Sequence, residues 1–149
     1  MHQDAVYVAV GSPMEFAASW IALEDIRPGS GELEYYDRSH SLEPYLFQGR
    51  YKRMPPNDPE HETYLQSLHE AAARKGLARV RFRAAKGDAL MWCADLAHGG
   101  SRVENPALSR RSLVTHYCPR ELDPAYFRQG RHTPKIPFGR GYYCHAVRR

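Results

Sequence analysis

Three side chains that could bind one metal ion together stand far apart in this sequence. His2 and Asp4 form a His-x-Asp tripeptide at the start of the chain, and His98 lies in the stretch Leu-Ala-His-Gly-Gly. Two histidines and one carboxylate on a rigid β-structure form the facial triad that binds non-haem Fe(II) and leaves coordination positions open. The pattern therefore indicates metal-centred oxidative chemistry. It also requires a fold that brings His98 close to His2 and Asp4.

His98 alone would be weak evidence, since a histidine beside two glycines is often only a loop residue. Three features arrive together, however: the upstream His-x-Asp, a strand-turn-strand context, and Arg110 on the next predicted strand. The two glycines also let the backbone turn sharply and approach a ligand closely. His40 is a less favoured ligand candidate, because a histidine at a strand end more often holds a loop.

Alternating apolar and polar residues predict short strands, as expected for a mainly β protein. In the first, Ala18, Trp20 and Ala22 share one face. The first two strands are expected to pair as an antiparallel hairpin, and the fully apolar 89–93 is expected to lie inside a sandwich. The arginines of 79–83 are expected on a solvated face, or else facing an anionic group. The predicted strands cover residues 16–23, 32–36, 79–83, 89–93 and 110–117.

One helix is predicted over residues 61–75, where an apolar stripe repeats at helical spacing and Gly76 follows as a C-terminal cap. The stripe is interpreted as packing. Before it, residues 41–60 contain four prolines and show no clear period. A loop of this length in a compact domain is usually a binding loop or lid, or else mobile, and we expect a lid.

Several blocks of the sequence together resemble one enzyme family. They are His-Gln-Asp at the start, WIALEDIRPGSGELEYYDRSH (20–40), Gly87-Asp88, His98-Gly99-Gly100 and RRSLVTHY (110–117). With these blocks the chain resembles the phytanoyl-CoA dioxygenase family of Fe(II)- and 2-oxoglutarate-dependent oxygenases. The resemblance implies a double-stranded β-helix (jelly-roll, cupin-like) core. Because the family carries a segment before His-x-Asp, residues 1–149 resemble its C-terminal part, a single partial domain incomplete at the N-terminus.

The resemblance also implies a site and a reaction. Fe(II) would be held by His2, Asp4 and His98, and Arg110 with Ser112 would hold the far carboxylate of 2-oxoglutarate, which a planar guanidinium suits. Trp20 matches a family position beside the cosubstrate, and Arg111 is the alternative to Arg110. The implied activity is that of a dioxygenase that uses O2 and hydroxylates a small-molecule substrate, with release of succinate and CO2.

Two other readings stay open. One is a non-catalytic fragment or pseudoenzyme that acts as a binding or interaction module, because a metal ligand at a chain end frays unless it is tied down. The other is a cupin-like enzyme that uses a different divalent metal without 2-oxoglutarate. Arg110 and Ser112 argue against the second, since they would then have no cosubstrate to hold.

Composition limits the partners. The net charge of +4 is scattered and no groove-reading motif accompanies it, so nucleic-acid binding is not expected. We also expect no membrane span, and the three cysteines lack metal-site spacing, which fits buried thiols in a reducing cytoplasm. The basic, aromatic extension 120–149 is expected to wrap the barrel or contact a subunit, or else to close over substrate. A homodimer through that extension or through unpaired sheet edges is a further expectation.

Overall fold

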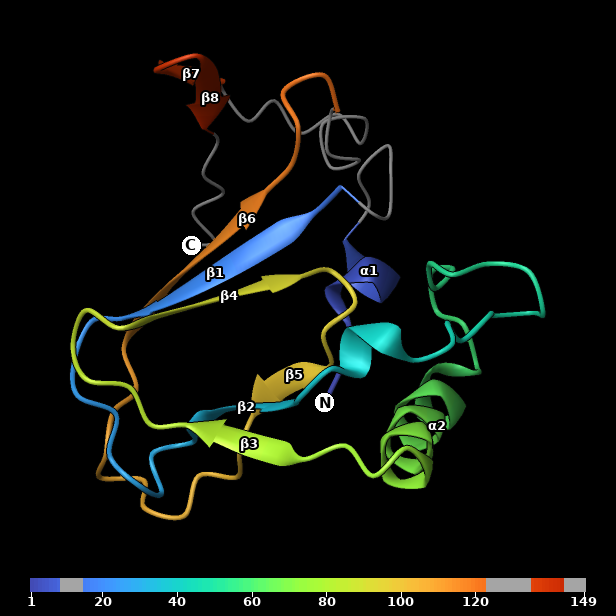
Figure 1. Cartoon of the computed structure of the whole chain (residues 1–149), viewed down its shortest axis with the longest axis horizontal. Helices are drawn as coiled ribbons and strands as arrows, with labels where there is room; N and C mark the ends of the chain where they lie inside the picture. The colour runs from blue at the N-terminus through green and yellow to red at the C-terminus, as the bar shows by residue number, and fades with distance from the viewer. Residues whose placement is uncertain (9–14, 123–134, 144–149) are drawn as a thin grey trace.

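The computed structural model describes residues 1–8, 15–122 and 135–143. Six strands form two three-stranded antiparallel sheets that face each other, as Figure 1 shows. The first sheet has the order β4-β1-β6, with β4 (Ala89–Cys93), β1 (Ala17–Ala22) and β6 (Ser112–Tyr117). The second has the order β3-β2-β5, with β3 (Arg79–Phe82), β2 (Leu33–Tyr36) and β5 (His98–Gly100). The mainly β prediction is confirmed.

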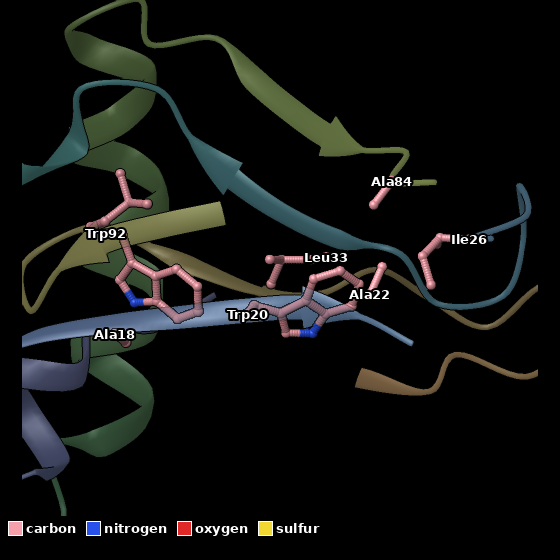
Figure 2. Packing of buried hydrophobic residues seen from close by; sticks show 8 residues of the cluster. Ala18, Trp20, Ala22, Ile26, Leu33, Ala84 and Trp92 are labelled. Carbon is pink, nitrogen blue, oxygen red and sulfur yellow. The ribbon is translucent and has the colours of Figure 1, made fainter. Parts of the chain in front are cut away.

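The main core lies between the two sheets. The predicted inner face of β1 is confirmed, because Ala18, Trp20 and Ala22 are all buried and point toward the opposite sheet. Figure 2 shows the ring of Trp20 lying near Leu33 of β2, with Trp92 of β4 farther along the same layer. Truncating such a buried tryptophan to alanine typically costs about 3–5 kcal/mol. This packing holds the two sheets together.

The predicted hairpin of the first two strands is wrong. β1 pairs with β4 and β6, whereas β2 pairs with β3 and β5, so the two strands belong to different sheets. The link over residues 23–32 is longer than the two to five residues of an ordinary hairpin loop. It is long enough to cross between sheets that stack about 10 Å apart.

The expectation that β4 lies wholly inside the sandwich is also wrong. Leu90 and Trp92 point inward, but Met91 is 68% exposed and Cys93 lies on the outer face. The outward-pointing residues of β4 are exposed, so only alternate residues of this apolar strand lie toward the interior. The expectation of buried thiols fails at Cys93, while Cys118 is partly buried and Cys144 lies outside the described residues.

The predicted helix is confirmed as α2 (His61–Arg74), and Gly76 adopts the left-handed φ of +63° typical of a helix C-cap glycine. Tyr64 and Leu68 of α2 pack into a second core with Phe47, which is fully buried. The predicted lid over 41–60, preceded by the short 3-10 helix η1 (Ser39–Ser41), is thus anchored through Phe47. Its role as a lid stays a prediction.

The arginine face of β3 points outward, as expected, but it is not simply solvated. Arg79 forms an ion pair with Glu34, and Arg81 lies 3.7 Å from Glu34 and 4.0 Å from Glu32. Both glutamates are almost fully buried on this face. The arginines therefore neutralise carboxylates of the protein itself, beside an open hollow of about 550 Å³ lined by Glu34, Arg79, Arg81 and Arg83.

The C-terminal extension is described only in part. β7 (Ile136–Phe138) and β8 (Gly141–Tyr143) pair with each other as a small hairpin, and the Arg120 guanidinium donates to the Arg140 carbonyl at 3.1 Å. The expected wrap over 120–149 falls largely on residues outside the description, so it stays a prediction, as does the homodimer. None of the helices described is long and apolar enough to cross a membrane.

Candidate metal centre

The N-terminal arm, residues 1–5, is tied to the segment 94–98 by backbone hydrogen bonds. His2 exchanges two bonds with His98, at 2.8 and 2.9 Å, and Ala5 N–H donates to the Ala94 carbonyl at 3.0 Å. Between them, the Gln3 side chain donates to the Asp95 carbonyl at 2.7 Å. The arm therefore extends the β3-β2-β5 sheet beyond β5. The short helix α1 (Asp4–Tyr7) begins within this arm.

This pairing brings the three predicted ligands together. The Asp4 Oδ1 atom lies 3.5 Å from His2 Nε2 and 3.7 Å from His98 Nε2, and the three ligand atoms all lie within 4.8 Å of one another. Donor atoms bound side by side to one metal ion at about 2.1 Å are roughly 3 Å apart. A modest contraction would therefore place all three around one ion, and the two nitrogens and one oxygen suit Fe(II).

The imidazole of His98 is oriented for metal binding. Its Nδ1 atom lies 2.9 Å from the Leu96 carbonyl, and because a carbonyl can only accept, Nδ1 carries the proton. That leaves the lone pair of Nε2 directed to the site, as in many histidine ligands. Burial lowers the pKa of His98, partly offset by this hydrogen bond. The ring is therefore in the neutral form that a metal ion requires.

Asp4 is held as an anion. Burial alone would raise the pKa of its carboxyl group, but the surrounding imidazoles and the indole N–H of Trp92 outweigh this and hold the pKa well below its usual range. The indole nitrogen donates to Asp4 Oδ2 at 3.0 Å, and His116 Nε2 lies 3.7 Å from the same oxygen. A buried carboxylate provides a negative charge that a bound cation would balance.

The site is closed on one side and accessible on the other. The side chains of His98 and Asp4 are 8% and 7% exposed, whereas those of His2 and His116 are 39% and 42% exposed. Val114 of β6 is paired with the buried, inward-facing Trp20 and therefore points to the same side of the sheet. Val114 is nevertheless half exposed, so the sandwich is open at this point. A small molecule can therefore approach from the side of His2 and β6.

Arg110 lies in the loop before β6 and not on the strand as predicted, since the ladder of β6 begins at Ser112. Its guanidinium donates to the Gly31 carbonyl at 2.7 Å and lies beside Gly100, where an added Cβ would be 3.1 Å from Nη1. Gly100 is two residues beyond His98, so both lie on the same face of β5. The arginine therefore reaches the face that carries the metal ligand.

The other predicted cosubstrate residues lie on the sheet opposite. Trp20 is buried on the inner face of β1, and Ser112 pairs with the inward-facing Ala22. Arg111, the alternative to Arg110, donates its backbone N–H to Glu24 and is exposed. His40 lies in η1 and is not part of the triad. Direct contact of these residues with a cosubstrate stays a prediction.

Sequence reasoning missed the residues that support the ligands. Trp92 and His116 reach Asp4, and the buried hydroxyl of Tyr64 accepts the Gln3 N–H at 2.9 Å. The alternation of β4 and β6 could have placed Trp92 and His116 on inward faces, but no local pattern links either to position 4. Tyr64 was assigned to packing alone, because it stands in the apolar stripe of α2.

A His-Asp-His group on a sandwich of two three-stranded sheets is an arrangement that could hold a metal ion in a jelly-roll protein. Residues 1–112 match the family model for phytanoyl-CoA dioxygenase. The chain belongs to this family, which confirms the predicted resemblance. No curated protein matches the chain.

Solved structures with a similar fold include the non-heme alpha ketoglutarate dependent carbocyclase SnoK from nogalamycin biosynthesis, with a TM-score of 0.59 and 17% identity. The epimerase SnoN from the same biosynthesis has a TM-score of 0.57 and 19% identity. AviO1 from Streptomyces viridochromogenes Tue57 has a TM-score of 0.50 and 22% identity. The chain is covered to 81%, 81% and 83% in the three comparisons, but it spans only 44%, 41% and 44% of those proteins. These likenesses support the jelly-roll fold.

Proposed function

We propose that this chain carries the catalytic core of an Fe(II)- and 2-oxoglutarate-dependent oxygenase that acts on a small molecule. One observation carries the proposal: two imidazole nitrogens and one anionic carboxylate converge at a site that is buried behind and accessible in front. Membership of the phytanoyl-CoA dioxygenase family supports it. So do similar folds in solved proteins whose names describe them as alpha ketoglutarate dependent.

In this proposal His2, Asp4 and His98 hold the iron. Their three donors would leave coordination positions free for small ligands. When bound, iron with 2-oxoglutarate and O2 supplies the oxidation: the cosubstrate becomes succinate and CO2, and one oxygen atom hydroxylates the substrate. The protein contributes binding, orientation and the exclusion of water.

Arg110 would bind the far carboxylate of 2-oxoglutarate. A guanidinium has five N–H donors, and its bond to the Gly31 carbonyl holds it beside Gly100 without using them all. Ser112 would add a hydroxyl donor, and Trp20 would form an apolar wall. The prime substrate would then enter past His2 and His116, the exposed histidines of the site.

Hydroxylation is the outcome we propose, although similar folds carry other reactions. The two solved neighbours from nogalamycin biosynthesis are named a carbocyclase and an epimerase. Incubation with candidate substrates, followed by mass spectrometry of the products, would separate these outcomes. A gain of one oxygen atom supports hydroxylation, whereas loss of two hydrogens or no change in mass contradicts it.

The first test is anaerobic addition of Fe(II) and then 2-oxoglutarate to the purified chain, followed by visible spectroscopy. We expect a charge-transfer band in the wild type and none in His98→Ala. His40→Ala is the matched control, because it removes an imidazole that lies outside the triad. A folded wild-type sample without the band would reject the proposal and favour a non-catalytic binding module.

A further inference from the structure

We propose that Trp92 is a positioning residue of the metal centre, an inference that rests on the proposed metal site. Its indole N–H holds Oδ2 of Asp4, so that Oδ1 alone is presented to the metal, and its ring supports His98. No feature of the sequence assigned Trp92 a role beyond the core.

The two carboxylate oxygens of Asp4 have different neighbours. Oδ1 faces the Nε2 atoms of His2 and His98, at 3.5 and 3.7 Å. Oδ2 accepts the Trp92 N–H at 3.0 Å in a buried hydrogen bond. His116 is the other group near Oδ2, but at 3.7 Å it is beyond hydrogen-bond distance. Within the described residues, Trp92 is therefore the donor that fixes how the carboxylate is rotated.

Trp92 also contacts the second buried ligand. Its ring centroid lies 4.6 Å from that of His98, with an angle of 49° between the planes. The Trp92 side chain thus contacts both Asp4 and His98, two candidate ligands that are close in space but far apart in the sequence. Mutating a residue that holds a metal ligand in this way typically lowers metal affinity or activity by 10 to 100-fold.

The fold makes room for this arrangement. Trp92 stands opposite Ala18 in the register of β4 and β1, and Ala18 is fully buried. A small residue at that position leaves space for an indole on the inner face. Among aromatic residues, tryptophan combines a large apolar ring with a buried N–H donor, which needs a partner when it is desolvated. Phenylalanine would fill much of the space but would leave Oδ2 without this donor.

Cobalt binding tests the inference without any turnover. We expect Trp92→Phe to bind Co(II) 10 to 100-fold more weakly than the wild type and to show an altered visible Co(II) spectrum. Trp20→Phe is the matched control for Co(II) affinity in the absence of cosubstrate, since the same change is made in the same core, where the Trp20 ring packs against Phe82. Wild-type affinity and spectrum in Trp92→Phe would overturn the role of Trp92 and leave the proposed function intact. Failure of the wild type to bind Co(II) would overturn both.

A second measurement tests the role of Trp92 even if Trp92→Phe does not fold. The chain has two tryptophans, so a proton-nitrogen NMR spectrum shows two indole N–H signals. In the metal-free chain, Asp4→Asn should move the Trp92 signal and leave that of Trp20 in place, because only Trp92 donates to Asp4. Zn(II) added to the wild type should move the same signal. A Trp92 signal that does not respond to either change would overturn the inference.

Discussion

His2 and His98 face each other across an antiparallel backbone bridge, joined by N–H to carbonyl bonds of 2.8 and 2.9 Å. Two candidate ligands from distant parts of the chain are thus placed by main-chain pairing and not by their side chains. Their rings lie 4.5 Å apart between centroids. A ligand at position 2 was expected to fray unless it is tied down. Here the backbone of the arm is hydrogen-bonded at His2, to His98, and again at Ala5, to Ala94.

The first prediction concerns this arm. Tyr64→Phe would leave the buried Gln3 N–H without its acceptor, at a cost of about 1–3 kcal/mol in the free energy of unfolding. The arm would also be held less firmly, so metal affinity should fall as well. Urea unfolding and Co(II) titration measure the two effects.

Tyr45→Phe is the control for Tyr64→Phe, because the Tyr45 hydroxyl donates to Glu60 and does not touch the arm. Its metal affinity should match that of the wild type. Wild-type metal affinity in Tyr64→Phe as well would show that the hydroxyl does not position His2 and Asp4.

The second prediction separates the two enzyme readings. Arg110→Ala should weaken 2-oxoglutarate binding at least about tenfold, since charge-assisted hydrogen bonds contribute about 1.5–3 kcal/mol, while Fe(II) still binds. Titration of the charge-transfer band measures the cosubstrate affinity. Arg111→Ala, a neighbouring exposed arginine, should behave as the wild type. Unchanged cosubstrate affinity in Arg110→Ala would favour a cupin-like site that does not use this arginine.

The third prediction concerns backbone strain before η1. Arg38 adopts a left-handed φ of +60°, which is unfavourable for a residue with a Cβ. Arg38→Gly should therefore raise the free energy of unfolding by up to about 1 kcal/mol, after the greater flexibility of glycine in the unfolded chain is allowed for. Arg38→Ala keeps the strain and removes the charge. Equal stability of the two variants in urea would mean that strain at this position is negligible.

The fourth prediction concerns acid stability at His69 of α2, which lies 2.9 Å from the Tyr36 hydroxyl. Burial lowers the pKa of His69, with Arg79 acting in the same direction and Glu34 opposing. The unfolded chain therefore binds a proton more readily than the folded chain, so stability falls as the pH drops below about 6.5. His69→Gln should lose less stability than the wild type between pH 7 and pH 5. Parallel curves of unfolding free energy against pH would contradict this.

Local patterns were sufficient for the longer elements, but not for the short ones α1, β5, β7 and β8. The spacing of Tyr64, Leu68 and Ala72 predicted α2, and the alternation around Trp20 predicted which face of β1 is buried, because each depends only on the geometry of one element. The ligand set was also visible, since His-x-Asp and His98-Gly-Gly are short motifs. Their residue types carry the chemistry whatever path the chain takes between them.

The tertiary structure alone decided how those elements meet. Sequence neighbours β1 and β2 were expected to pair, but the loop between them is long enough to cross the sandwich, and pairing depends on register with distant strands. The same holds for Trp92, whose inward direction follows from alternation but whose hydrogen bond to Asp4 does not. That contact spans most of the chain, and periodicity along one strand contains no information about which residue stands opposite.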